Sequence, residues 1–291
     1  MNEICHPQCS VVVVTYNSTV GAADCLKAMF TAAAVPDVEW IVVDNSENHD
    51  EAAELERIFK SRARVVHTGC NLGFAGGVNR GVSEAHGDWI LLLNPDVLIS
   101  AQDVERVLIS LRTVPEGVFS LAGCLKTGDR VFQGIDLRLG VWFEDRLATS
   151  HREMVGPSGG FGAFRRVEFL SLGGLDEGLF AWGEDVEFAL RARSRGFVAR
   201  PLDIVLPHLG GHSVIDGGIA RKRAYSLAKN RFVVARKYYS PLKFGLLLLL
   251  WVAYFPGRFL QNRRRGTVRA DIAGVLDGLF GRTLLGKRYL W

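Results

Sequence analysis

The 291-residue sequence has few cysteines and lacks the cysteine pattern of a disulfide-stapled or zinc-binding protein. The five cysteines are odd in number and include no CxxC pair, so we expect reduced thiols in a cytoplasmic protein. The first ten residues, MNEICHPQCS, contain no basic segment followed by a long apolar segment, which argues against a signal peptide. The cysteines are Cys5, Cys9, Cys25, Cys70 and Cys124.

Acidic residues are scarce near the C-terminus. Residues 220–291 contain 16 Lys/Arg and 2 Asp/Glu, a local charge of +14, whereas residues 1–219 carry −10 within the total of +4. We therefore expect the basic tail to bind an anionic partner. Nothing in the sequence resembles a nucleic-acid-binding module, so the favoured anionic partner is a membrane surface rather than a nucleic acid.

A long hydrophobic run is also absent. The longest apolar run, Gly245–Phe255, has about 11 residues, fewer than the roughly 20 needed to span a bilayer. Together with the preceding basic helix expected over 219–239 and with Arg263–Arg265, it predicts a helix that lies in the membrane interface. A buried helix or a dimer contact is the alternative, and the apolar residues of Leu276–Leu285 could also serve a subunit contact in a homo-oligomer.

The remaining sequence predicts an α/β fold. Short β-branched runs alternate with helical stretches, which indicates a doubly wound, mostly parallel sheet with helices on both faces. We expect a catalytic domain over residues 1–218 and a helical appendage over 219–291. Residues 128–158 show no regular pattern. The expected strands are 10–15, 40–44, 64–67 and 88–93, and the expected helices include 51–60, 74–86 and 184–195.

Polar residues follow three of the predicted strands: Thr15-Tyr16-Asn17, Asp44-Asn45-Ser46 and Asn94-Pro95-Asp96. Because ligands bind at the carboxyl ends of parallel strands, these residues should line one crevice. Asp44 could accept hydrogen bonds from a pyrimidine or a ribose, and Thr15, Tyr16 and Asn17 could contact the same nucleotide. Turn formation explains both segments equally well.

A divalent cation site is the second expectation. Asp96 at a strand end could hold Mg²⁺ or Mn²⁺ together with substrate phosphates, and a neutral His208 could complete the metal shell. The alternatives are a turn capped by Asp96 and a loop histidine bonded to solvent or backbone. For His212, in the same segment, the interpretation as a loop histidine is the favoured one.

Two further segments have both a functional and a structural interpretation. Asn71–Gly77 leads into a helix, whose N-terminus and flexible glycines, Gly73 among them, suit a phosphate, although the segment matches neither GxGxxG nor a Walker A loop. Close helix packing is the alternative. Trp182-Gly183-Glu184-Asp185 begins a helix and offers a general base, with Asp185 preferred over Glu184, unless both acids only complement the helix dipole.

Taken together, these segments resemble the family-2 glycosyltransferases of the GT-A fold, and within them the bacterial rhamnosyltransferases of cell-wall and surface-polysaccharide assembly. Seven stretches occur in the family's order and cover about residues 10–240. They are VVVVTYNS (11–18), IVVDNS (41–46), NLGFAGGVNRG (71–81), LLLNPDV (91–97), GGFGAFRR (159–166), GGLDEGLFAWGEDVEFALRARSRGF (173–197) and HLGGHS (208–213).

The resemblance implies an inverting transfer of L-rhamnose from dTDP-L-rhamnose to a polyprenyl-diphosphate-linked saccharide at the inner face of the cell membrane. Asp185 would be the general base, and Asp96 and His208 would approach the metal or the diphosphate. The donor would contact Thr15, Tyr16, Asn17, Asp44, Asn71, Gly73, Asn94 and Trp182.

One residue departs from the general pattern of the GT-A fold. The usual DxD is Asn94-Pro95-Asp96 here, so an amide replaces one carboxylate and should weaken metal binding. A transferase of another UDP- or dTDP-sugar, a sugar nucleotidyltransferase and a non-catalytic nucleotide-binding module are the competing functions. A sugar nucleotidyltransferase usually has a basic glycine-rich loop after the first strand, and the segment TYNSTVGAAD at that position is neither basic nor glycine-rich. A non-catalytic nucleotide-binding module would not need the acidic pair at 184–185.

Overall fold

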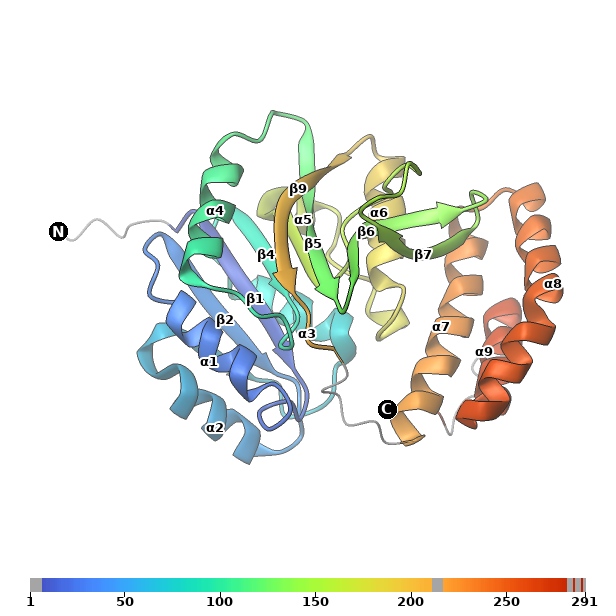
Figure 1. The fold of residues 1–291 in the computed structure, drawn as a ribbon, viewed down its shortest axis with the longest axis horizontal. Helices are drawn as coiled ribbons and strands as arrows, with labels where there is room; N and C mark the ends of the chain where they lie inside the picture. Colours follow the sequence, from blue (N-terminus) through green and yellow to red (C-terminus); the bar gives the residue numbers. More distant parts are fainter. Residues whose placement is uncertain (1–6, 211–216, 282–284, 286–288, 290–291) are drawn as a thin grey trace.

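A computed structural model describes residues 7–210, 217–281, 285 and 289 (Figure 1). Its centre is one sheet with the order β3-β2-β1-β4-β8-β5-β6-β7, and β9 pairs with β5. The strands are β1 (Cys9–Thr15), β2 (Val38–Asp44), β3 (Arg64–His67), β4 (Trp89–Leu93), β5 (Val118–Thr127), β6 (Arg130–Arg138), β7 (Trp142–Leu147), β8 (Phe161–Arg165) and β9 (Val198–Pro207).

Helices cover both faces of this sheet, as predicted. The side chains of β1 alternate between two cores, with Val11 and Val13 facing one and Val12 and Val14 the other. Helices α1, α2 and α4 pack on the first core, and α3, α5 and α6 on the second. Their bounds are α1 (Ala23–Ala32), α2 (His49–Phe59), α3 (Gly73–Ser83), α4 (Ala101–Arg112), α5 (Arg166–Ser171) and α6 (Glu184–Ser194), and η1 (Lys60–Arg62) and η2 (Glu177–Leu179) are 3₁₀ turns.

The four predicted strands are present and parallel to one another, but the sheet continues beyond them. β8 runs antiparallel between β4 and β5, and β6 and β7 form an antiparallel hairpin at the edge. The hairpin occupies most of the stretch that shows no regular pattern in the sequence. Asp136, Glu144 and Asp145 lie in these strands, so their apolar residues do not form the uninterrupted runs of β1 and β4.

The basic tail folds into three long helices, α7 (Gly217–Tyr238), α8 (Pro241–Arg265) and α9 (Val268–Phe280), at the β7 side of the sheet (Figure 1). The tip of the β6–β7 hairpin enters their core, where Val141 meets Phe232 and Leu247. α9 approaches α7 closely because a side chain at Gly274 or Gly278 would lie within 3 Å of the α7 backbone. The tail is therefore packed against the catalytic sheet.

The expected apolar run of about 11 residues is the central part of α8, which has 25 residues and contains Pro256. An 18-residue window of α8 has a mean hydropathy of 1.4, and 6% of that window is buried. In the part of the chain that the structure describes, α8 alone is long and apolar enough to cross a membrane by length and composition. Leu242, Leu249 and Val252 are among its exposed side chains.

Candidate active site

The carboxyl ends of β1, β2 and β4 meet at one edge of the sheet. β1 lies between the other two strands, with Thr15 opposite Asp44 and Val13 opposite Leu93. The residues that follow these strands are therefore brought together, as the sequence predicts. The side chain of Thr15 is buried, and its hydroxyl donates to the carbonyl of Val43 at 3.2 Å. Tyr16 and Asn17 are the more accessible residues of this segment.

Asp44 lies beneath this edge, fully buried, and both of its carboxylate oxygens have protein partners. Oδ2 is 2.6 Å from Nδ1 of His67, and Oδ1 accepts the backbone N–H of Ser46 at 3.0 Å. The sequence analysis missed His67, although it ends β3 directly opposite Asp44. Among the described residues its Nε2 is buried without a hydrogen-bond partner. The Asp44–His67 pair could therefore present a polar atom to a bound nucleobase.

The loop after β1 is fixed by Glu51 of α2. One carboxylate oxygen of Glu51 accepts the backbone N–H groups of Ser18 and Thr19 at 2.6 and 3.0 Å, and the other accepts the Thr19 hydroxyl at 2.7 Å. Three hydrogen bonds to this one buried side chain hold the position of Tyr16 and Asn17. No local sequence pattern predicts this contact, because 32 residues separate Glu51 from Thr19.

Asn45 connects the end of β2 to the Asn71–Gly77 segment. Its amide donates to the carbonyl of Gly73 at 2.9 Å and accepts the N–H of Leu72 at 3.0 Å, while Asn71 accepts the N–H of Gly73 at 2.9 Å. Gly73 has φ +75°, and a side chain there would collide with Phe180. The glycine is therefore needed for the close approach of two loops, which is the structural alternative considered for this segment.

Asp96 and His208 contact each other, as a shared role at a cation would require. Asp96 Oδ1 is 3.1 Å from His208 Nε2, and His208 Nδ1 is 3.1 Å from the hydroxyl of Thr127. A backbone bridge between Val97 and His208 holds the two segments together, although 112 residues separate Asp96 from His208. The hydrogen bond to Asp96 raises the pKa of His208, and Asp145 adds to this shift.

This donor set fits a divalent cation that also binds a diphosphate. A carboxylate oxygen and an imidazole nitrogen face one place, and Mg²⁺ and Mn²⁺ complete their shells with substrate phosphate and water. Within residues 7–210 and 217–281, no third His, Cys, Asp or Glu joins the pair closely enough for a cation held by protein ligands alone. Asn94 lies beside Gly160, to whose carbonyl its backbone N–H donates at 3.1 Å.

The predicted base lies at the start of α6. Asp185 Oδ2 accepts the N–H of Gly159 at 3.1 Å, and Oδ1 accepts the N–H of Val186 at 2.8 Å. Burial, with Asp145 as a further cause, raises the pKa of Asp185 to about 6. Glu184 is buried more deeply and its Oε2 has no hydrogen-bond partner among the described residues, so burial and the neighbouring Asp185 raise its pKa well above the usual range. Near neutral pH, Asp185 is thus the ionised member of the pair.

Asp145 of β7 is the carboxylate that the sequence analysis missed. Its charge raises the pKa of both Asp185 and His208, so it lies near the predicted base and near the predicted metal ligands. Its side chain reaches solvent but is surrounded by protein, and burial raises its own pKa. Only the antiparallel pairing of β7 with β6 brings Asp145 to this position, and the sequence pattern gave no indication of that pairing.

The loop before α6 has an unusual backbone. Phe180, Trp182 and Gly183 have φ of 63°, 65° and 107°, which costs energy at the two aromatic residues. The side-chain amide of Asn230, from α7, donates to the carbonyls of Leu179, Ala181 and Trp182 at 2.8, 3.0 and 2.8 Å. Asn230 thus holds Trp182 and the start of α6 in place.

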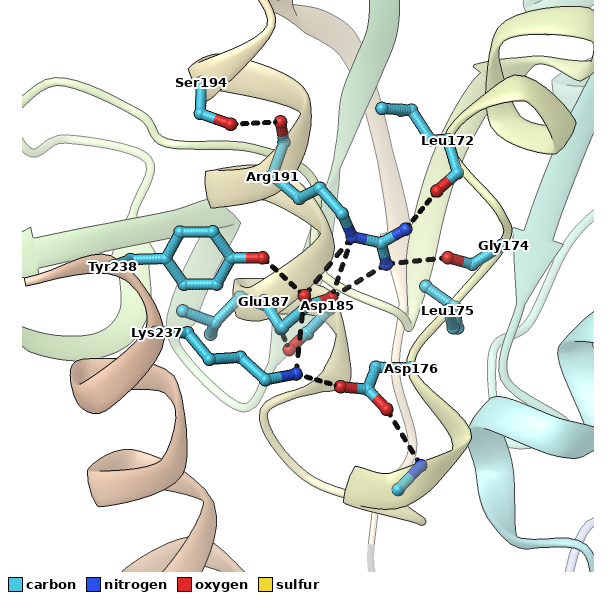
Figure 2. Close-up of polar contacts among 12 residues, drawn as sticks. Leu172, Gly174, Leu175, Asp176, Asp185, Glu187, Arg191, Ser194, Lys237 and Tyr238 are labelled. Atoms are coloured by element: carbon cyan, nitrogen blue, oxygen red, sulfur yellow. Dashed lines mark hydrogen bonds and ion pairs between the residues drawn. The ribbon is translucent and has the colours of Figure 1, made fainter.

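A second network fixes α6 below Asp185 (Figure 2). Glu187, one turn into the helix, pairs with Arg191 at 2.8 Å and accepts the hydroxyl of Tyr238 at 2.5 Å. Arg191 also donates to the carbonyls of Leu172 and Gly174. The charged residues after Asp185 in the EDVEFALRAR stretch therefore orient the helix, and Asp185 itself faces the opposite way toward Gly159.

Some predicted residues lie outside the described part of the chain. Cys5, the 211–213 part of the HLGGHS stretch with His212, and several residues of Leu276–Leu285 belong to this group. Of the cysteines that are described, Cys9, Cys25, Cys70 and Cys124 are free thiols, as expected.

Comparison with known proteins agrees with this geometry. The model of the family described as glycosyl transferase family 2 matches residues 10–169. The low-salt glycan biosynthesis hexosyltransferase Agl10 of Haloferax volcanii is 21% identical over 94% of this chain and 92% of its own length. The N-acetylglucosaminyl-diphospho-decaprenol L-rhamnosyltransferase of Mycobacterium tuberculosis is 25% identical over 65% of this chain and 71% of its own.

The fold is also similar to solved structures. A mannosyltransferase from Pyrobaculum calidifontis, solved in complex with GDP-Man and Mn²⁺, superposes with a TM-score of 0.57 at 15% identity. The superposition covers 95% of this chain and 88% of that one. It therefore spans most of the sheet and of the C-terminal helices, and it establishes the likeness of the two folds.

Proposed function

We propose, because the chain belongs to glycosyl transferase family 2, that it transfers L-rhamnose from dTDP-L-rhamnose to a saccharide linked to a polyprenyl diphosphate. The family match makes the chain a glycosyltransferase of the hexosyltransferase kind and favours sugar transfer over nucleotidyl transfer. The mycobacterial relative supports the choice of sugar and of acceptor class. The observation that carries the proposal is Asp185, an ionised, half-buried carboxylate bonded to the N–H of Gly159, whose neighbour Gly160 accepts the N–H of Asn94 at the end of β4.

Asp185 is the general base of a single displacement that inverts the anomeric carbon. It takes the proton of the acceptor hydroxyl while that oxygen attacks C1 of the donor sugar, and the bond from C1 to the diphosphate breaks. A pKa of about 6 keeps the carboxylate ionised at neutral pH yet makes it a stronger base than an ordinary aspartate. The hydrogen bond from the Gly159 N–H fixes the orientation of the Asp185 carboxylate.

The donor nucleotide lies along the edge formed by β1, β2 and β4. Asp44 with His67 contacts the base or ribose, and Tyr16 and Asn17 with the turn at Asn71 and Gly73 line the same end. Thr15 supports this edge from below. Asn94 after β4 and Trp182 in the loop before α6 contact the donor sugar in this proposal.

Asp96 and His208 would hold the predicted Mg²⁺ or Mn²⁺, with Asn94 as a neutral neighbour. A bound cation would neutralise charge on the diphosphate leaving group. Asp96 has a shared hydrogen bond with His208, so the two side chains are already placed together before a nucleotide binds. The Mn²⁺ in the mannosyltransferase structure with a similar fold supports the metal assignment.

The C-terminal helices place the protein on the inner face of the cell membrane. Exposed apolar side chains of α8, with Arg263–Arg265 at its end, suit the boundary between lipid head groups and acyl chains. In this proposal residues 1–218 form the nucleotide-sugar-binding domain and residues 219–291 the membrane-associating region. A subunit contact through α9 and the following residues remains the alternative role of the tail.

Thermal unfolding with a panel of nucleotides tests the donor assignment. A ligand that binds the folded chain raises its apparent stability by mass action, so dTDP with Mn²⁺ or Mg²⁺ should raise the Tm more than dTDP alone. UDP, GDP and ADP serve as the matched comparison. If GDP or ADP gave the largest metal-dependent shift, the dTDP-rhamnose assignment would fall. If no nucleotide shifted the Tm, the proposed nucleotide-binding site, and with it the transferase function, would be contradicted.

A further inference from the structure

A second pocket lies on the other side of the β6–β7 hairpin from the candidate active site. It has a volume of about 270 Å³ and lies between the hairpin and α8. Successive side chains of a strand point to opposite faces, so Trp142 and Asp145 of β7 face opposite ways. Its lining residues are Arg138, Trp142, Tyr254, Gly257 and Arg258.

Arginines and aromatic rings together form this pocket. The guanidinium carbon of Arg138 is 5.7 Å from the centre of the Tyr254 ring, and that of Arg258 is 5.7 Å from the Trp142 ring. The two rings meet edge to face at 5.9 Å. Behind the Trp142 ring lies a third guanidinium, that of Arg231, at 4.0 Å. The aromatic faces stabilise the cations and fix their orientation.

Positive charge exceeds negative charge at this place. Arg258 is paired with Asp271, whereas Arg138 and Arg231 have no ion pair with any described residue. Arg231 is buried and its Nε, like that of Arg258, has no hydrogen-bond partner in the described chain. Burial and the neighbouring Arg258 lower the pKa of Arg231 to about 9. Buried N–H donors without acceptors are costly, and because Arg258 lines the pocket, an anion bound there could supply the acceptor that its Nε lacks.

An apolar stripe of α8 leads into the same pocket. Its residues follow one another at intervals of three or four, which places them along one side of a helix. Leu242 and Leu249 are 85% and 70% exposed, and Gly257 lines the pocket itself. From end to end the stripe is about 27 Å long. Its members are Leu242, Leu246, Leu249, Ala253, Gly257 and Leu260.

We propose that this arginine pocket binds the phosphate or diphosphate head group of a lipid whose hydrocarbon chain lies along the α8 stripe. Guanidinium groups form paired hydrogen bonds to phosphate oxygens, and two of them, those of Arg138 and Arg258, line this pocket. The adjoining stripe selects an amphiphile over a soluble anion, because it offers apolar surface next to the pocket for the hydrocarbon chain of a bound lipid. Neither feature is needed for donor binding at the other face of the hairpin.

β7 connects the pocket to the catalytic cleft. From Trp142 to Asp145 the strand advances three residues, about 10 Å. A saccharide attached to a head group in the pocket could therefore extend around the hairpin toward Asp145 and Asp185. This last step alone rests on the proposed transferase function, whereas lipid binding by the pocket does not.

Vesicle sedimentation without any nucleotide tests the proposal. The probes are phosphatidylcholine vesicles with and without a small fraction of a polyprenyl phosphate. We expect the polyprenyl phosphate to strengthen binding of the full-length chain by about tenfold or more, the value of one charge-assisted hydrogen bond. R138E should abolish this gain, and R138Q should reduce it. Arg138 is exposed, so both variants should keep the wild-type Tm.

R62E is the matched control, because Arg62 is also exposed and also stacks on an aromatic ring, that of Phe30 at 4.2 Å. It should retain the full gain. An unchanged gain in R138E, or an equal loss in R62E, would overturn the proposal. If inorganic diphosphate raised the Tm of the wild type but not of R138E, while polyprenyl phosphate gave no gain, a soluble anion would replace the lipid. Because no donor is present, a negative nucleotide panel would leave these results intact.

Discussion

Two adjacent carboxyl groups at the start of α6 differ in environment, and this difference decides which of them can act. Glu184 is buried deeply, with a raised pKa and an oxygen that lacks a partner in the described chain. Asp185 lies nearer the surface and accepts two backbone N–H groups, which offset part of its burial. The sequence could place both acids at a helix start but could not rank them by burial, because that ranking depends on Gly159 and β7.

Turnover should depend on pH through Asp185. A base must be ionised, and the pKa of Asp185 is raised to about 6, so kcat/KM should level off above about pH 7 and fall about tenfold per pH unit well below pH 6. An ordinary aspartate would stay active down to about pH 4. A pH–rate profile with a limb near pH 4 instead would contradict the assignment.

The raised pKa of Asp185 also affects the stability of the folded chain, which it lowers at neutral and alkaline pH. The folded-state pKa lies above the unfolded value of about 3.9, so stability falls as the pH rises from about 4 to about 6, and the loss is complete above that. Asp185→Asn should therefore raise the Tm by roughly 2–5 °C at pH 8, and the gain should vanish near pH 4. Calorimetry of both proteins at the two pH values measures this, and a lower Tm at pH 8 would argue against a strained carboxylate.

Asp96 governs the metal response in this account. Asp96→Ala removes the only carboxylate that contacts His208 among the described residues, so the additional Tm increase that Mn²⁺ gives to dTDP should disappear. The shift by dTDP alone should persist, because the base and ribose contacts lie at Asp44. Asp203→Ala, on β9, is the control for loss of a carboxylate elsewhere. A full Mn²⁺ response in the Asp96 variant would exclude Asp96 as a ligand.

At the scale of secondary-structure elements, α7 positions the catalytic helix α6. The Asn230 amide donates to three carbonyls of the loop with positive φ values, and Tyr238 bonds to Glu187. Tyr238 joins α7 to α6 itself, whereas Asn230 contacts the loop before α6 that carries Trp182. This difference provides a matched pair of variants.

Asn230→Ala should lower kcat at least tenfold with little change in the KM for the donor, since it releases the loop that orients Trp182 and Asp185. Tyr238→Phe removes one hydrogen bond between the same helices and should lower the Tm by a few degrees without a comparable loss of kcat. Equal effects of the two variants on kcat would mean that Asn230 has only a structural role.

The elements that could be predicted from the sequence are those with uninterrupted local patterns. β1, β2 and β4 are short apolar runs that end in polar residues, so both their existence and their meeting edge followed from the pattern. β6 and β7 were missed because charged residues interrupt them and their partners lie across a hairpin. Three single residues, Asp145, Glu51 and Asn230, were missed because each contacts residues far away in the sequence, and local spacing does not encode such contacts.

At the scale of the whole molecule, the acidic body and the basic tail form one packed unit. Val141 at the hairpin tip lies in the core of α7, α8 and α9, and Asn230 reaches the catalytic loop. The charge asymmetry was visible in the sequence, but the contact between tail and active site was not. A membrane bound by α8 would therefore be held at a fixed orientation to the cleft.

Membrane binding should depend on the exposed face of α8. Leu249→Glu combined with Val252→Glu places charges at two exposed apolar positions and should reduce flotation with anionic liposomes by tenfold or more. Ile109→Glu, at an exposed apolar position of α4, adds the same type of charge elsewhere and should leave flotation unchanged. Equal flotation of all three proteins would show that α8 does not face the membrane.

The most direct measurement of the central claim is the rate of dTDP release from dTDP-L-rhamnose with a polyprenyl-diphosphate saccharide as acceptor, for wild type and Asp185→Asn. The account predicts that the variant loses about 10²–10⁴-fold in kcat while its dTDP-induced Tm shift stays at the wild-type value. A variant that kept more than roughly a tenth of the wild-type kcat would contradict Asp185 as the general base, given that losing a positioned base costs at least about 10².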